Sequence, residues 1–282
     1  MTWLNQLLVL PLSFPFMQRA LFVAVVIAIC CAVMSCFLIL RGWSLMGDAI
    51  SHAVLPGIVL AAAAGLPLAI GAFLAALICA TGSGWLNANS RVKSDTVLGI
   101  VFSGMFALGL VLFTMIDSDQ HLLHILFGNV LGVQTSDVVE VVIFGGGCLV
   151  FVLLRRRDLL LASFDPAHAK AIGLPVAFLH YGMLVALALT IVVSIKAVGV
   201  ILVVAMLIAP GAIGFLMTSR FDAMLLISVA SAVISAAAGT IGSFHLDAAT
   251  GACIVLAQAA LFVAALLFAP RKGLLATRQA TA

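Results

Sequence analysis

Long apolar segments, separated by short polar or charged ones, follow one another along almost the whole chain. A helix that crosses a bilayer needs about 20 apolar residues, because its backbone groups must satisfy their hydrogen bonds within the helix. Runs bounded by charged residues, glycine or proline predict spans at 20–40, 48–64, 67–86, 96–116, 138–154, 176–195, 198–218, 223–242 and 249–269. The run 48–64 is short and begins with polar residues, so the pattern leaves about eight or nine crossings open. The predicted fold is an all-α polytopic membrane protein with one transmembrane domain over 1–282.

Composition strengthens this prediction. Of the 282 residues, 65% are hydrophobic and 8% are charged, whereas soluble domains have about 45–50% and about 25%. A folded chain of this size buries only about three quarters of its surface, so the apolar excess requires lipid as its solvent. Little chain is left for a soluble nucleotide-binding or nucleic-acid-binding domain. No phosphate-binding G-x-x-x-x-G-K-[ST] sequence is present, so ATP would have to be bound by a partner.

The lysines and arginines predict the orientation. Cytoplasmic loops carry an excess of basic residues, and the loop 155–175 holds three consecutive arginines and Lys170. If this loop is cytoplasmic and successive spans cross the membrane in opposite directions, all of the 13 basic residues except Arg19 and Lys196 lie on the cytoplasmic side. The loop 116–137 is then extracytoplasmic.

A short helix is predicted within the loop 155–175. Asp165 followed by Pro166 is typical of a helix start, with aspartate as N-cap and proline at the first helical position. Gly173 and Pro175 end the segment after about two turns. Because so little of the chain lies outside the membrane, such a helix indicates a site on which a partner docks.

The most unusual polar residues are Asp48 and His52, which lie in the segment RGWSLMGDAISHAVLPG. Residues four apart share one face of a helix, and a carboxylate at mid-membrane depth costs about 2.5–3.5 kcal/mol on insertion scales. Pro56 cannot donate to the carbonyl of His52, and Gly57 allows close approach of another helix. Carboxylate and imidazole ligands suit Mn, Fe or Zn. Spacing alone leaves a second interpretation open, in which Asp48 caps the helix after Gly47 and His52 bonds to a neighbour.

Weaker candidates lie on the predicted outer side. His121 and His124 lie in the loop 116–137 and could attract a cation, although a solvated loop that contacts a partner is the favoured interpretation. Asp247, near His245, could line an outer access route for an ion or could cap a helix. Gly211, Gly214 and Gly239 within the spans indicate close helix packing.

Three segments together resemble the membrane permease subunit of bacterial manganese/zinc/iron ABC importers, and most of all its manganese/iron branch. They are LRGWSLMGDAISHAVLPG, SFDPAHAKAIGL and KAVGVILVVAMLIAPGAIGFL. The resemblance covers nearly the whole chain.

The resemblance implies a transport subunit of the bacterial inner membrane that is not itself an enzyme. Two such permeases, identical or related, would dock on cytoplasmic ATPase subunits and receive metal from an extracytoplasmic metal-binding protein. The transported ion would be Mn, Fe or Zn, and no cofactor would be bound permanently. Asp48 and His52 match the family's metal contacts. The ATPase-coupling region matches residues 164–174, and its candidate residues are Phe164, Asp165, Pro166, His168, Ala171 and Gly173.

Three other functions are considered. A permease for a metal chelate, such as a siderophore or cobalamin, predicts a wide pathway without an ionisable pair. An ion-coupled secondary carrier usually has inverted repeats and several carboxylates within the membrane. An intramembrane enzyme needs a nucleophile with a base, and no such pair is evident. The choice of metal and the identity of the second permease stay open.

Overall fold

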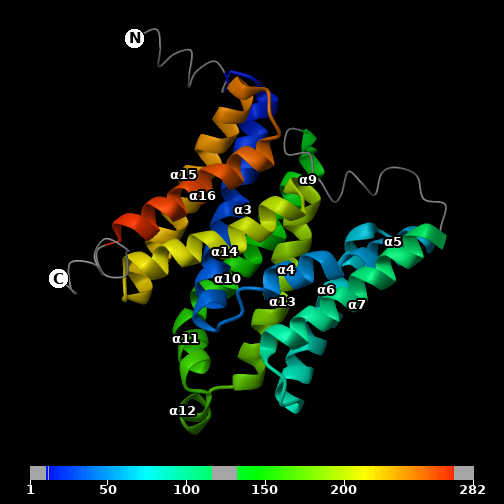
Figure 1. Cartoon of the computed structure of the whole chain (residues 1–282), viewed down its shortest axis with the longest axis vertical. Helices are drawn as coiled ribbons and strands as arrows, with labels where there is room; N and C mark the ends of the chain where they lie inside the picture. The colour runs from blue at the N-terminus through cyan, green and yellow to red at the C-terminus, as the bar shows by residue number, and fades with distance from the viewer. Residues whose placement is uncertain (1–10, 12, 116–131, 270–282) are drawn as a thin grey trace.

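The computed structural model describes residues 11, 13–115 and 132–269, which form helices and connecting turns, with no strand among them (Figure 1). The helices in chain order are α3 (Pro15–Leu40), α4 (Met46–Ala53), α5 (Leu55–Ala63), α6 (Leu68–Asn89), α7 (Ser94–Met115), α9 (Thr135–Glu140), the π-helix η3 (Val141–Gly145), α10 (Gly146–Leu154), α11 (Arg156–Phe164), α12 (Pro166–Ala171), α13 (Val176–Val198), α14 (Val200–Met217), α15 (Phe221–Leu246) and α16 (Thr250–Phe268).

Within the described ranges, nine helical segments are long and apolar enough to cross a membrane. The prediction of an all-α polytopic protein is therefore confirmed, and the doubtful run 48–64 corresponds to one of the nine, Met46–Ala63. The other predicted spans agree with the helices to within a few residues. The largest differences are at α3, which begins at Pro15 rather than 20, and at α15, which continues to Leu246 rather than 242.

The helices form two groups that lie side by side in Figure 1. In one group α3 packs against α14 and α15, which in turn contact α16, although α3 is far from these helices in the sequence. In the other group α5 packs between α6 and α7. Helix α13 contacts both groups through α3, α4 and α6.

Small residues allow the close packing, as the glycine pattern predicts. A Cβ on Gly211 of α14 would overlap the backbone of Ser35 on α3, and one on Gly239 of α15 would overlap Ile254 of α16. Pro210 lies inside α14 and has no N–H to donate to the helix. On either side of it, the Ser35 hydroxyl of α3 accepts from the N–H of Gly211 at 2.9 Å and donates to the carbonyl of Ile208 at 3.2 Å. A side chain of one helix thus bonds to the backbone of another next to the proline.

The loop 155–175 contains more helix than the sequence pattern predicts. Besides the expected short helix α12, residues Arg156–Phe164 form α11. This helix begins with arginines but has an apolar side, since Leu159 and Ala162 are buried and α11 packs on α13. Figure 1 shows α11 extending from the end of α10 to α12, which lies at the bottom of the view.

Candidate functional site

Asp48 and His52 lie one turn apart on α4, as their spacing predicts. The Oδ1 atom of Asp48 is 3.4 Å from Nε2 of His52, and the side chains are 38% and 33% exposed. Both groups are therefore close enough to share a ligand and open enough to be reached by one. Among the described residues no cluster of three or more His, Cys, Asp and Glu side chains occurs, so one copy of the chain supplies two side-chain ligands here.

The rest of α4 holds this pair in place by packing its opposite face. Gly47, Ala49 and Ile50 are buried, and a Cβ on Gly47 would press on the side chain of Leu207 in α14. The N-cap of α4 is Leu45, with no side-chain cap hydrogen bond. Asp48 is therefore not the N-cap, and the capping interpretation of this residue is wrong.

Two phenylalanines of α7 surround the imidazole of His52. The ring centroids of Phe102 and Phe106 each lie 5.6 Å from that of His52, the second in an edge-to-face arrangement. These contacts limit the rotation of the imidazole, whose Nε2 atom lies near Asp48. The sequence analysis missed both rings, because they come from a segment about fifty residues away that reads as an ordinary apolar span.

The chain bends between α4 and α5 at Val54. The N–H of Val54 is directed to the carbonyl of His52, and Pro56 has no N–H to donate to it, so an open coordination position on this carbonyl stays a prediction. The expected close approach at Gly57 is confirmed, since a Cβ there would overlap the carbonyl of Gly71 on α6. Likewise a Cβ on Gly109 of α7 would lie 2.8 Å from the ring of Pro56. Helix α5 therefore packs closely against both α6 and α7.

One cavity adjoins His52, and a second lies next to it. One of about 20 Å³ is lined by His52, Ser51 and Phe106, among others. A second of about 280 Å³ shares Val54, Ile58 and Ile195 with the first, and Glu140 and Lys196 line it as well. The two cavities are therefore neighbours, and of the two only the smaller one is lined by His52.

An ion-pair cluster joins α9 and α13 beside the larger cavity. The Nζ atom of Lys196 is 2.9 Å from Oε1 of Glu140 and 3.0 Å from Oδ1 of Asp137. Alternation of the spans places all three residues on the predicted extracytoplasmic side. The sequence analysis located Lys196 and Asp137 on that side but had no signal that would pair them across the intervening helices.

Helix α12 has the caps that the sequence predicts. The Oδ1 atom of Asp165 accepts from the N–H of His168 at 2.8 Å, Pro166 is the first helical residue, and Gly173 has a φ of +82°. His168 and Ala171 are exposed, as are Phe164 at 65% and Ile172 at 56%. Ala169 is fully buried, so one side of α12 packs against the protein and the other side is exposed.

A polar contact connects this region to the segment that leads into α4. The Nε atom of Arg41 donates to the hydroxyl of Ser163 at 2.7 Å, and its guanidinium carbon lies 4.9 Å from the centre of the Trp43 ring. Burial lowers the pKa of Arg41 to about 10, so it stays charged at neutral pH. A cavity of about 800 Å³ separates Arg41 and Trp43 from Pro166 and Lys170 of α12.

The weaker candidates on the predicted outer side are His121, His124 and Asp247. His121 and His124 lie outside the described residues. Asp247 is exposed at the C-cap of α15 with a left-handed φ of 48°, where it ends the helix. Neither cavity near His52 is lined by Asp247.

Comparison with known proteins assigns a family to this arrangement. Residues 13–269 match the ABC 3 transport family. Over 268 residues the chain is 58% identical to the chelated iron transport system membrane protein YfeD of Yersinia pestis, covering 95% of this chain and 90% of that protein. It is 51% identical over 269 residues to the manganese transport system membrane protein MntB of Synechocystis sp., covering 95% and 88%. The solved structure of PsaBC from Streptococcus pneumoniae in complex with Fab superposes with a TM-score of 0.85 at 38% identity, covering 98% of this chain and 99% of that one.

Proposed function

The chain belongs to the ABC 3 transport family, and we propose that it forms the membrane pathway through which a divalent manganese or iron ion enters the cytoplasm. It is the permease subunit of a metal-importing ABC transporter, as the manganese and iron transport proteins similar to it also indicate. Asp48 and His52 are the contacts of the ion within the membrane, and zinc is a possible further cargo.

The geometry of the pair carries this proposal. A hard carboxylate oxygen and an imidazole nitrogen 3.4 Å apart can bind one ion together, and both donors suit first-row divalent metals. Their partial exposure lets an ion arrive and leave. A transport site must release its cargo, so an incomplete ligand set serves transit better than a closed cage of four protein ligands, which is typical of structural metal sites.

A single copy offers too few ligands for a dehydrated cation, which supports a working unit of two permeases. Twofold symmetry would bring a second Asp48 and His52 to the same ion. The second subunit is another copy of this chain or a related permease. Cross-linking in native membranes should trap permease pairs, and full transport by a complex with one permease would contradict this part of the proposal.

The partners follow from the orientation and from α12. A cytoplasmic ATPase docks on the exposed side of the region 164–174, with Phe164, His168 and Ala171 among its contacts, and supplies the energy of ATP hydrolysis. An extracytoplasmic metal-binding protein delivers the ion on the opposite side. The complex resides in the bacterial inner membrane.

The size of the cavity beside His52 argues against a chelate as cargo. About 20 Å³ is room for about one water molecule, whereas sites for larger organic ligands occupy about 300–1,000 Å³. A bare or partly hydrated ion fits this space. A secondary carrier explains neither the exposed helix α12 nor the similarity to an ABC transport family.

The test is uptake of radiolabelled manganese and iron in cells that lack other importers. Asp48→Asn keeps the shape of the side chain and removes its charge, so uptake should fall at least tenfold with the amount of permease in the membrane unchanged. The matched control is Asp95→Asn, an exposed aspartate in the first turn of α7, which should retain normal uptake. If Asp48→Asn is inserted normally and carries metal at the wild-type rate, the proposed pathway is wrong.

A further inference from the structure

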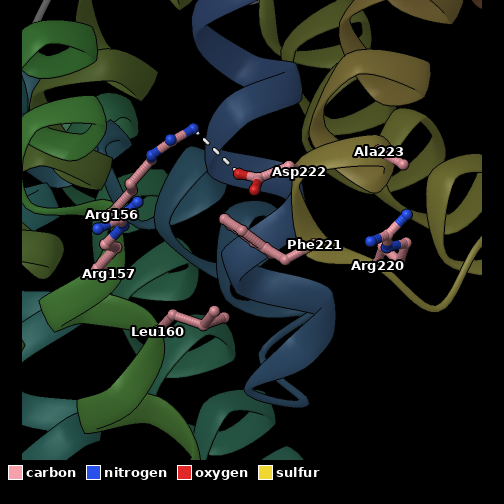
Figure 2. Close-up of a pocket in the computed structure, with 7 residues that line it drawn as sticks. All are labelled: Arg156, Arg157, Leu160, Arg220, Phe221, Asp222 and Ala223. Carbon is pink, nitrogen blue, oxygen red and sulfur yellow. Dashed lines mark ion pairs between the residues drawn. The ribbon is translucent and has the colours of Figure 1, made fainter.

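A basic hollow lies where α11 and α15 begin, away from the metal pathway. Its volume is about 280 Å³, and Arg156, Arg157 and Leu160 of α11 face Arg220, Phe221 and Asp222 across it. Figure 2 shows Arg156 and Arg157 on one side and Arg220 on the other, with Phe221 and Asp222 between them. We propose that this hollow binds the phosphate headgroup of an anionic phospholipid from the cytoplasmic leaflet.

The charges of the hollow are not balanced. The Nη1 atom of Arg156 is 3.0 Å from Oδ1 of Asp222, which compensates one guanidinium. Among the described residues, Arg157 and Arg220 have no carboxylate within ion-pair distance, and both side chains are exposed. Two positive charges therefore face the solvent, and they form the complement of a phosphodiester group.

The hollow is a fixed feature of the fold. The ring of Phe221 packs edge-to-face on Phe37 of α3 with centroids 5.1 Å apart, and Phe37 is fully buried. This contact secures the start of α15. The first turn of α15 contains Asp222, whose carboxylate offsets the positive end of the helix dipole, so the excess positive charge of the hollow comes from its arginines.

The position along the chain places the hollow at the membrane surface. Arg156 and Arg157 come two and three residues after the apolar segment that ends at Leu154, and Arg220 lies between the segments ending at Met217 and beginning at Phe221. Basic side chains at this level on the cytoplasmic side are attracted to anionic lipids. Leu160 and Phe221 offer apolar contacts to the part of the lipid that adjoins its headgroup.

The same position disfavours the ATPase as the occupant. The two arginines lie at the first turn of α11, whereas α12 follows its last residue, Phe164. Nine helical residues rise about 13 Å, so the hollow is about one helix length nearer to the membrane than the docking helix. Figure 1 shows this separation between the start of α11 and α12.

Lipid binding can be measured on the purified full-length permease by native mass spectrometry. Wild type should retain phosphatidylglycerol at least tenfold more tightly than phosphatidylcholine with the same acyl chains. The double variant Arg157→Gln/Arg220→Gln should bind phosphatidylglycerol about tenfold or more weakly, since each basic residue near a surface contributes about 1 kcal/mol. Arg157→Lys/Arg220→Lys, which keeps both charges, should retain most of the binding.

The matched control is Arg91→Gln/Lys93→Gln, which removes two exposed charges on the same predicted side but outside the hollow. It should bind phosphatidylglycerol as wild type does.

Equal retention of phosphatidylglycerol by the Arg157→Gln/Arg220→Gln variant and by wild type, or equal retention of both lipids by wild type, would overturn the proposal. Displacement of the lipid by equimolar inorganic phosphate would assign the hollow to free phosphate instead. A variant that keeps phosphatidylglycerol but loses its ATPase would show that the hollow is a protein contact. None of these readouts depends on metal transport, so the proposed function is tested separately.

Discussion

Arg41 and Ser163, which are 122 positions apart, are joined by a hydrogen bond of 2.7 Å from the guanidinium Nε to the hydroxyl. Arg41 begins the turn that leads into α4, which carries the proposed metal contacts Asp48 and His52. Ser163 is next to the last residue of α11, which leads into α12. This bond is thus a direct link between the proposed ATPase-docking region and the helix that carries Asp48 and His52.

Removing either partner should destabilise the protein through the same bond. Hydrogen bonds to charged groups contribute about 1.5–3 kcal/mol, so Arg41→Gln and Ser163→Ala should each lower the midpoint of thermal unfolding. The double variant should be little worse than Arg41→Gln alone. Scanning fluorimetry of the purified permease measures this, with Ser103→Ala as control, because the Ser103 hydroxyl is exposed and bonds only within α7 to Gly99. Fully additive effects would show that the two side chains are not coupled.

The exposed side of α12 should be required for the ATPase. Ala167→Glu/Ala171→Glu introduces two charges at exposed positions, so the ATPase subunit should no longer copurify while the permease is inserted normally. Ala169 is excluded from this test because it is fully buried, and a charge there would damage the fold. The control is Ala248→Glu/Ala249→Glu, an exposed pair on the predicted outer side. Normal copurification and ATP-driven uptake in the α12 variant would refute docking at this helix.

Changing the donor at position 52 should change the preference among metals. Thiolate ligands favour zinc over manganese, whereas oxygen ligands favour manganese. His52→Cys should therefore raise zinc uptake relative to manganese by several-fold, and His52→Asp should shift the ratio in the opposite direction, both with lower total uptake than wild type. Competition between labelled manganese and unlabelled zinc gives this ratio directly. An unchanged ratio in both variants would mean that His52 does not contact the ion.

Gly57 should be necessary for the packing of α5. A Cβ there would overlap the backbone of Gly71, and overpacking of this kind costs about 1–3 kcal/mol. Gly57→Ala should therefore lower the thermal midpoint and reduce metal uptake. Gly99→Ala is the matched control, since no atom lies within 4 Å of a Cβ at that position on α7 and alanine favours helix by about 1 kcal/mol over glycine. The idea fails if both variants are equally stable.

Features that depend only on neighbouring residues were predictable from the sequence. The length of each apolar run determined the spans, because a helix in lipid must satisfy its own backbone. The order Asp165, Pro166 and Gly173 determined both ends of α12, since capping is local. The spacing of Asp48 and His52 determined that they share a face, because four residues make about one turn.

The contacts between side chains far apart in the sequence could not be predicted, because they depend on how the helices pack. Phe102 and Phe106 surround His52 because Gly109 lets α7 cross α5 closely, and no pattern along α7 distinguishes these rings from others in an apolar span. Lys196 pairs with Glu140 across 56 positions, and Arg41 with Ser163 across 122. Helix α11 was missed for the same reason: its polar start reads as a loop, and its helical form is stabilised by burial of Leu159 and Ala162 against α13, a contact that depends on where the other helices lie.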